Sequence, residues 1–265
     1  MQRQHYFILL SYNGTTYHGW QIQKNAITVQ QVLNEKLSLK FQEPIEVTGA
    51  GRTDTGVHAL FFVAHFDANN FNLDNPVLIE PLNRFLPADI VVHQIIKTKP
   101  EANARFDARS RTYRYYLSCK KTPFFPDLRF VVPQLPDMVK MNIVAEKLLT
   151  VSDFTAFAKL HSDNKTNICK LTEAKWVLMP DGMYFTITAD RFLRNMVRAI
   201  VGSLMEVGYG KLAVDDFLER VLKKDRYFAS LTAPAHGLFL YDIGYPDEIF
   251  VNEKNPLIKL KDLFV

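Results

Sequence analysis

The sequence is poor in cysteine and lacks any long apolar run. Only Cys119 and Cys169 occur among the 265 residues, far apart and without the spacing of a metal site. We therefore expect free thiols in a reducing compartment rather than a disulfide framework. No segment approaches the roughly 18 apolar residues that a membrane span needs, and no cleavable signal pattern precedes the first apolar segment. These absences predict a globular, cytoplasmic protein.

Several catalytic motifs are also missing. The seven histidines show no metal-ligand clustering, and the His-x-Glu…Pro-Cys-x-x-Cys pattern of zinc deaminases does not occur. Neither the Gly-Lys-Ser/Thr ending of a P-loop nor a Gly-x-Gly-x-x-Gly run between strand and helix is present. Base deamination and a phosphate-binding loop of either kind are therefore disfavoured.

The charge balance leans towards the basic side. The formal net charge is +4 and the sequence pI is about 8.9. This permits a polyanionic partner without requiring one, so the distribution of the basic residues matters more than their total.

The spacing of apolar residues predicts two successive series of similar elements. In the first series, strands are expected at residues 5–12, 44–48, 59–66 and 90–96, with helices that begin at Thr28 and at Asn75-Pro76. In the second, strands are expected at residues 111–118, 171–179, 183–188 and 238–245, with one helix capped by Asp137 and others at residues 191–205 and 214–224. The predicted fold class is α+β, with two ferredoxin-like halves (β-α-β-β-α-β) that form a pseudo-repeat. The expected domains are residues 1–103 and 104–246, followed by a C-terminal tail of residues 247–265.

The richest segment chemically is Gly49-Ala50-Gly51-Arg52-Thr53-Asp54-Thr55-Gly56. Three glycines in eight residues predict a tight backbone that a ligand can approach closely. In an extended stretch Arg52 and Asp54 would point the same way, and the arginine cation would favour the ionised carboxylate. An ionised, oriented carboxylate is suited to act as a nucleophile or a base.

Other interpretations of this loop stay open. A hairpin turn with a surface ion pair would explain an isolated Arg-x-Asp equally well. Asp54-Thr55-Gly56 is also the tripeptide of aspartic proteases, but those enzymes need two carboxylates that share a proton. Only one copy occurs here, and Arg52 would oppose retention of that proton. His58 adjoins the loop and could form either a structural hydrogen bond or a substrate contact.

Arginine and aromatic residues are mixed in the predicted strand at residues 111–118. Alternation places Arg111, Tyr113 and Tyr115 on one face and Arg114 with Tyr116 on the other. Arginine can hold phosphates, and an aromatic ring can stack on an extruded base at ~1–3 kcal/mol. An ordinary strand would show the same composition, so this segment alone leaves RNA binding undecided.

A second basic pattern lies in the helix expected at residues 191–205. Arg191, Arg194 and Arg198 have the spacing i, i+3, i+7 and would share one helix face. Such a face is either simply solvated or a contact for a polyanion.

Taken together, six stretches in a fixed order resemble the bacterial TruA family of tRNA pseudouridine synthases. They are Tyr12-Asn13-Gly14 with Gly19-Trp20-Gln21, Gly51-Arg52-Thr53-Asp54-Thr55-Gly56-Val57-His58-Ala59, Ala104-Arg105-Phe106-Asp107-Ala108 with Tyr113-Arg114-Tyr115, Asp153-Phe154-Thr155-Ala156-Phe157, Asn195-Met196-Val197-Arg198-Ala199-Ile200-Val201-Gly202-Ser203-Leu204, and His236-Gly237-Leu238-Phe239-Leu240. One Arg-Thr-Asp would be weak evidence, whereas six ordered matches over nearly the whole chain are strong evidence.

The resemblance implies a homodimeric enzyme, without a metal or organic cofactor, that isomerises uridines at positions 38–40 in the anticodon arm of tRNA. It also implies that the two ferredoxin-like halves lie around a central basic cleft. Asp54 matches the catalytic aspartate of the family, and Arg52 matches an arginine linked to base extrusion and to positioning of the aspartate. Tyr113 matches a tyrosine that packs against the target base. Arg198 matches a helix arginine that pairs with the aspartate, and Leu238 matches an apolar residue of the uracil pocket. The remaining expected substrate-binding residues are Arg111, Arg114, Arg194 and His58.

Two positions depart from the family pattern. Thr55 stands where alanine is common, and residues 156–159 lack an arginine that some relatives have. The second departure leaves the RNA contacts near Phe157 undefined. Neither departure removes a proposed catalytic group.

The rival from another class is a non-catalytic RNA-binding or RNA-chaperone module on the same fold. It predicts RNA binding without isomerisation and gives Asp54 no special importance.

Overall fold

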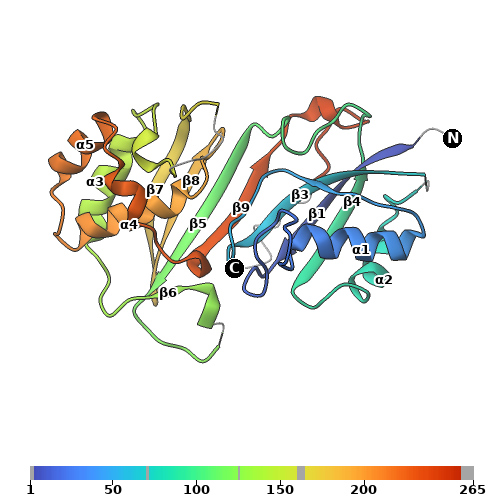
Figure 1. Cartoon of the computed structure of the whole chain (residues 1–265), viewed down its shortest axis with the longest axis horizontal. Helices are drawn as coiled ribbons and strands as arrows, with labels where there is room; N and C mark the ends of the chain where they lie inside the picture. Colours follow the sequence, from blue (N-terminus) through green and yellow to red (C-terminus); the bar gives the residue numbers. More distant parts are fainter. Residues whose placement is uncertain (1–2, 70–71, 125, 160–164, 258–265) are drawn as a thin grey trace. The chain divides into compact units, whose positions relative to one another are not determined.

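The computed structural model describes residues 3–69, 72–124, 126–159 and 165–257 (Figure 1). Two compact units are present: residues 1–109 with 240–265 form the first, and residues 110–239 form the second. Each unit combines antiparallel strands with helices, so the α+β class is confirmed. The division at residues 103 and 246 stays a prediction about domains.

The first unit is built on a sheet whose central strand is almost entirely buried. Its elements are β1 (Gln4–Tyr12), α1 (Val29–Phe41), β2 (Thr48–Gly49), β3 (His58–Ala68), α2 (Ile79–Asn83), β4 (Ile90–Lys97) and the part of β9 (Leu238–Gly244) from residue 240 onwards. The strand order is β4-β1-β3-β9, and β2 also pairs with β3. Residues 6–10 of β1 are at most 1% exposed. Because successive side chains point to opposite faces, β1 is covered on both sides.

Helix α1 forms where the sequence predicts it. The Thr28 hydroxyl accepts a hydrogen bond from the Gln31 N–H at the helix start, as an N-cap residue should. The buried residues of the helix recur every four positions, which gives one apolar face: Val29, Leu33, Leu37 and Phe41. This face covers the sheet, and Phe41 stacks on Phe66 of β3.

The strand expected at residues 44–48 is wrong for most of its length. Only Thr48 and Gly49 pair with β3. The backbone of the preceding residues bonds instead to side chains of α1: the Ile45 N–H donates to Ser38 Oγ (2.8 Å) and the Val47 N–H donates to Asn34 Oδ1 (2.9 Å). The backbone donors are therefore satisfied by a helix rather than by a neighbouring strand.

The second unit places its helices beside a three-stranded core. Its elements are β5 (Ser110–Ser118), β6 (Phe130–Val131), α3 (Met138–Leu148), β7 (Leu171–Met179), β8 (Gly182–Ala189), α4 (Met196–Gly208) and α5 (Val214–Leu222). The strand order is β5-β8-β7, with β6 beside β5. Helix α3 packs on β7 and against α4 and α5 (Figure 1). The N-cap at Asp137 and the Pro180-Asp181-Gly182 hairpin are confirmed.

The helix expected at residues 191–205 begins later than predicted. Asn195 adopts a left-handed conformation with φ of 66°, so helical hydrogen bonding starts only at Met196. Arg191 and Arg194 therefore precede the helix, and Arg198 lies in its first turn. The predicted three-arginine stripe on one helix face is wrong.

The described part of the expected C-terminal tail packs on the first unit. Phe250 is 1% exposed and forms a β-bridge with Thr98, and the Lys99 N–H donates to Ile249 O (3.1 Å). Residues 258–265 of the expected tail lie outside the described residues.

Candidate active site

The loop that contains Asp54 is held by main-chain hydrogen bonds to the segment that follows β1. It connects β2 to β3 and packs on the segment that follows β1. The Trp20 N–H donates to Thr53 O (3.3 Å), and the Gly56 N–H donates to Tyr17 O (3.4 Å). Within the loop the Val57 N–H donates to Asp54 O (3.1 Å). The main chain is thus tied on both sides of Asp54.

Two glycines allow this close packing. Gly19 has φ of +81°, and a Cβ atom added to it would lie 2.3 Å from Thr53 O. A Cβ atom added to Gly14 would lie 2.0 Å from Val57 O. Since both distances are far below van der Waals contact, any side chain at either position would push the Asp54 loop outwards.

Side chains add two buried anchors. The hydroxyls of Tyr12 and Thr53 are hydrogen-bonded at 2.8 Å. His58, which is 1% exposed, accepts a hydrogen bond from the Gly14 N–H at Nδ1 (3.0 Å), so the ring is held with its other nitrogen protonated. This bond supports the structural alternative for His58, and its expected contact with substrate stays a prediction.

Behind the loop, Asp89 fixes the segment on which the loop packs. The Tyr17 hydroxyl donates to Asp89 Oδ1 (2.6 Å), and the Thr16 hydroxyl donates to Oδ2 (3.0 Å). Burial and, secondarily, the bond to Asp89 raise the pKa of Tyr17, so its phenol stays a donor. The Asn13 N–H donates to Asp89 O (2.9 Å).

Arg52 and Asp54 flank the buried Thr53 but form no ion pair with each other. Arg52 is exposed and Asp54 is partly exposed, so both side chains lie on the open side of the loop, as alternation predicts. Among the residues that the structure describes, Arg52 has no hydrogen-bond or ion-pair partner. The surface ion pair of the alternative interpretation is therefore not formed between these two residues, and the expectation that the Arg52 cation favours the ionised Asp54 carboxylate stays a prediction.

In the second unit, strand β5 presents the expected basic and aromatic residues. Its register with β8 is uninterrupted, with Tyr113 opposite Ile187, so the predicted alternation of faces is confirmed. The rings of Tyr113 and Phe192 pack edge to face, with their centres 5.2 Å apart. Arg114, on the other face, lies 4.6 Å above the Tyr184 ring.

The segment of residues 233–238 is hydrogen-bonded both to strand β5 and to helix α4. Arg198 Nε donates to Ala233 O (2.7 Å), and the Ala233 N–H donates to Arg198 O (3.1 Å). The Tyr115 hydroxyl donates to Pro234 O (2.9 Å). Burial raises the pKa of Tyr115, and the Arg198 cation partly offsets that rise. The Arg198 side chain and the buried Leu238, 5% exposed, are thus both tied to one anchored segment.

The outer arginines of the expected set have different settings. Arg111 Nη1 donates to Asp190 O (2.9 Å), so this side chain is bound to the end of β8. Arg194 is exposed, just before the left-handed Asn195. Its exposure makes the Arg194 side chain accessible to a phosphate.

Sequence reasoning missed the residues that hold the Asp54 loop. Tyr12, Gly14 and Gly19 stood out only as parts of a family motif, and Asp89 gave no signal at all. Tyr12 and Thr53 are 41 positions apart, so no local pattern connects them. Positive φ at Gly19 is the one requirement that a glycine in the sequence could have indicated.

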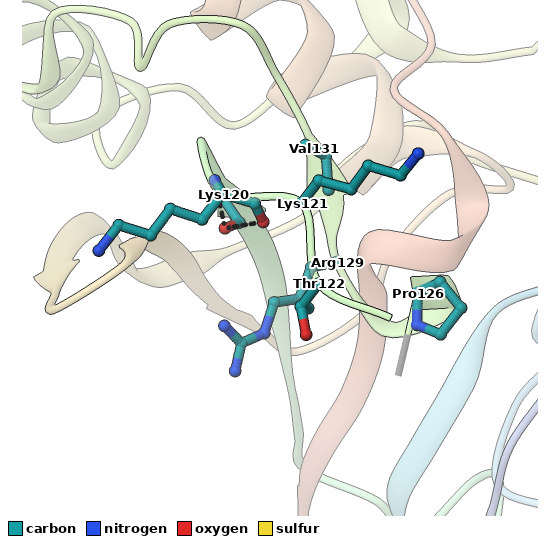
Figure 2. A pocket seen from close by; sticks show the side chains of 7 residues that line it. Lys120, Lys121, Thr122, Pro126, Arg129 and Val131 are labelled. Atoms are coloured by element: carbon teal, nitrogen blue, oxygen red, sulfur yellow. Dashed lines mark hydrogen bonds between the residues drawn. The ribbon is translucent and has the colours of Figure 1, made fainter. Parts of the chain in front are cut away.

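A basic cavity at the end of β5 does not make a second site. It has a volume of about 220 Å³ and is lined by Ser118, Lys120, Lys121, Thr122, Pro126, Arg129 and Val131. Figure 2 shows the ends of Lys120 and Lys121 directed away from each other. Arg129 is paired with Asp181. Since these cations do not converge, the cavity has no built anion site.

Two further searches gave negative results for the described residues. No group of three or more His, Cys, Asp or Glu side chains is placed to hold a metal ion. None of the described helices reaches the length and apolar character that a bilayer crossing requires.

Comparison with known proteins points in one direction. A family model described as tRNA pseudouridine synthase matches residues 8–107 and 144–246. The chain is 51% identical over 251 residues to "tRNA pseudouridine synthase A" of Bacteroides fragilis, covering 94% of this chain and 100% of the relative. A protein of the same name from Parabacteroides distasonis is 51% identical over 92% of this chain and 97% of its own length. Another, from Acetivibrio thermocellus, is 37% identical over 90% and 98%.

Proposed function

Because this chain belongs to the family of tRNA pseudouridine synthases, we propose that it isomerises uridines at positions 38–40 of the tRNA anticodon arm with Asp54 as its catalytic carboxylate. The reaction breaks the N1–C1′ glycosidic bond, turns the uracil and joins C5 to C1′. The C5 proton is lost and N1 gains one, so atoms and electrons balance without an oxidant or reductant. The enzyme is an isomerase. The comparisons give no support to a purely RNA-binding module.

The observation that carries the role of Asp54 is its placement on an anchored loop. The neighbouring Thr53 is buried and bonded to Tyr12, the Thr53 and Asp54 carbonyls both accept main-chain bonds, and the Asp54 side chain remains partly exposed. The carboxylate of a fixed loop is already oriented before the substrate binds. Less conformational entropy is then lost in the reaction step, which is how orientation contributes to catalysis.

Three steps are open to this carboxylate. It can attack C1′ of the ribose, add to the uracil ring, or remove a proton from the sugar. Each requires that the uridine first leave the base stack, at a cost of a few kcal/mol. We propose that Arg52, exposed beside Asp54, stabilises this extruded state rather than the carboxylate itself, because no ion pair occupies its guanidinium.

The remaining expected residues complete the proposal. Tyr113 packs against the target base, Leu238 lines the uracil pocket and Arg198 acts in catalysis. Arg111, Arg114 and Arg194 bind the RNA, and His58 serves mainly through its bond to Gly14. Support for these roles comes from the exposed or half-buried setting of the arginines and Tyr113 and from the bonds that orient Arg198.

We also propose that the two halves form a ferredoxin-like pseudo-repeat. In the first unit the elements follow the order β-α-β-β-α-β along the chain, and the strands lie in the sheet in the order β4-β1-β3-β2, as in a ferredoxin-like fold. In the second unit the order β5-β8-β7 repeats the first, third and second strands of the same arrangement. We further propose, from the family resemblance, that the enzyme acts in the cytoplasm as a homodimer and needs no cofactor.

The function is tested with unmodified tRNA transcripts that carry tritium at C5 of uridine. Pseudouridine formation releases this tritium, and mapping of the product identifies the position. We expect release from transcripts with uridine at positions 38–40 and none when cytidine replaces those uridines. Isomerisation elsewhere in the tRNA would contradict the anticodon-arm assignment, and no release at all would contradict the function.

Arg198 and Arg194 are expected to separate catalysis from binding. Arg198→Ala removes a cation whose direction Ala233 fixes, and loss of one preorganised charged group lowers kcat by about 10²–10³-fold. Arg194→Ala removes an exposed cation, so we expect kcat to stay and the tRNA Kd to rise, with a smaller dependence of affinity on salt. Single-turnover kinetics and filter binding at two salt concentrations measure both effects. If each variant lost kcat and tRNA affinity to the same extent, this division of roles would be refuted.

A further inference from the structure

A short turn between β4 and β5 exposes an aromatic ring next to a guanidinium. Phe106 is 77% exposed, and the guanidinium carbon of Arg105 lies 5.5 Å from the centre of its ring. Nothing in the catalytic proposal uses either side chain. At this exposure the Phe106 ring is accessible to a binding partner, and aromatic faces are suited to stacking.

The turn itself is closed by its own polar side chains. The Asn103 side-chain oxygen accepts from the N–H groups of Arg105 (3.0 Å) and Phe106 (3.1 Å). The Asp107 carboxylate accepts from the Asn103 N–H (2.6 Å), and the Asp107 N–H donates back to Asn103 O (3.0 Å). The backbone that carries the two exposed side chains is therefore defined before any partner arrives.

Buried and half-buried aromatic side chains hold the underside of the turn. The Ala104 N–H donates to His65 Nδ1 (3.1 Å), and Ala104 O accepts from the Tyr245 hydroxyl (2.5 Å). His5 Nε2 contacts Ala102 O at 2.6 Å. Burial, with a smaller contribution from the charge of His5, lowers the pKa of His65 to about 4, so its ring stays neutral and able to accept the Ala104 N–H. The turn is anchored to the core of the first unit.

The chemistry of the exposed pair fits an unpaired nucleotide better than a protein surface. An aromatic face stacks on a base of any sequence, and a neighbouring arginine holds the phosphate. A protein interface needs a contiguous apolar core. Along residues 101–109, however, Phe106 is the one exposed apolar side chain, between exposed Glu101, Arg105 and Arg109 and the buried alanines.

We propose that Phe106 and Arg105 form a stacking platform for an unpaired tRNA nucleotide other than the target uridine. The ring stacks on the base, and the Arg105 guanidinium binds the adjoining phosphate. The proposal rests on the proposed function in that tRNA is the substrate, but it concerns affinity and not the isomerisation step.

The test compares tRNA affinity and turnover in matched variants. Phe106→Ala should weaken binding of an unmodified tRNA transcript about tenfold or more, as loss of one base–aromatic stack does, and should leave kcat at saturating tRNA unchanged. Phe106→Trp, which keeps a flat aromatic face, should bind within about twofold of the parent. Val77→Ala is the control, because Val77 is 76% exposed in the same unit and should show no change.

Three outcomes would overturn the platform. They are unchanged affinity in Phe106→Ala, full affinity in Phe106→Leu, which would indicate a plain apolar contact, and a shift of Phe106→Ala to a smaller species in sedimentation, which would place the ring between two copies of the chain. Failure of the proposed function looks different. The unsubstituted protein would then bind tRNA without releasing tritium, and the Phe106 comparison would still be readable from binding alone.

Discussion

Asp54→Asn is expected to reduce pseudouridine formation by on the order of 10⁴-fold or more, as removal of a catalytic nucleophile or base does. Asparagine has nearly the same shape but cannot attack as an anion or remove a proton. The bonds that hold the loop use the main chain at Asp54 and the side chain of Thr53, so the loop should keep its place. Single-turnover tritium release from C5-labelled tRNA measures the loss, and filter binding measures the tRNA Kd, which should change little.

The matched control for this substitution is Asp74→Asn. Asp74 is an exposed aspartate of the same unit and lies outside the Asp54 loop, so it should leave both turnover and thermal unfolding unchanged. Retained isomerisation in Asp54→Asn would refute its catalytic role. A parallel fall in melting temperature would instead mean that Asp54 acts through the fold.

Gly19→Ala is expected to impair catalysis from outside the reactive loop. The added methyl would lie 2.3 Å from Thr53 O, and the residue would also have to keep φ near +81°. We expect stability to fall by about 1–3 kcal/mol through backbone strain. Turnover should fall about 100-fold, because a displacement of about 1 Å at a reacting group costs that much. Urea unfolding and single-turnover tritium release measure the two effects.

Gly210→Ala separates strain from displacement. Gly210 has a similar φ of +72°, but nothing lies within 4 Å of an added Cβ. It should therefore lose comparable stability to backbone strain and keep its turnover. If both variants lost turnover equally at a temperature where both are folded, the contact between Gly19 and the Asp54 loop would have no catalytic meaning.

Local signals predicted much of the fold correctly. The β7–β8 hairpin follows from Pro180-Asp181-Gly182 between two apolar runs, and the caps at Thr28 and Asp137 follow from side chains that bond to their own helix. In each case the stabilising partner is only a few residues away. Such interactions are visible in a sequence because they need no knowledge of distant segments.

Alternation and periodicity misled where the partner was of another kind. Ile45 and Val47 are both buried while Glu46 is exposed, which is the pattern of a strand, but their backbone bonds to Asn34 and Ser38 of α1. Likewise Leu193, 4% exposed, continues the apolar spacing of α4 backwards. Burial is periodic in both cases although the hydrogen bonding is not that of the expected element.

The sequence suggested the chemistry of the candidate site but not the contacts that support it. The dense glycines around Asp54 predict a reactive loop, and the mixed arginines and tyrosines of β5 are compatible with an RNA-binding strand or an ordinary one; both remain predictions. The bonds from Tyr12 to Thr53 and from Arg198 to Ala233 join residues 41 and 35 positions apart. Only the folded chain brings these residues together, so no single-sequence pattern could have shown them.

The double attachment of the Asp54 loop also bears on the thermodynamics of substrate binding. Its amides at Ala50, Gly56 and Val57 are already bonded within the protein, so they should exchange slowly with deuterated solvent before RNA is added. Fixing the backbone of one residue costs about 1–2 kcal/mol of conformational entropy. This loop is already ordered in the folded protein, so tRNA binding does not have to order it. Under the proposed function, the unfavourable entropy of complex formation would then fall mainly on the RNA, in which the target base would have to unstack.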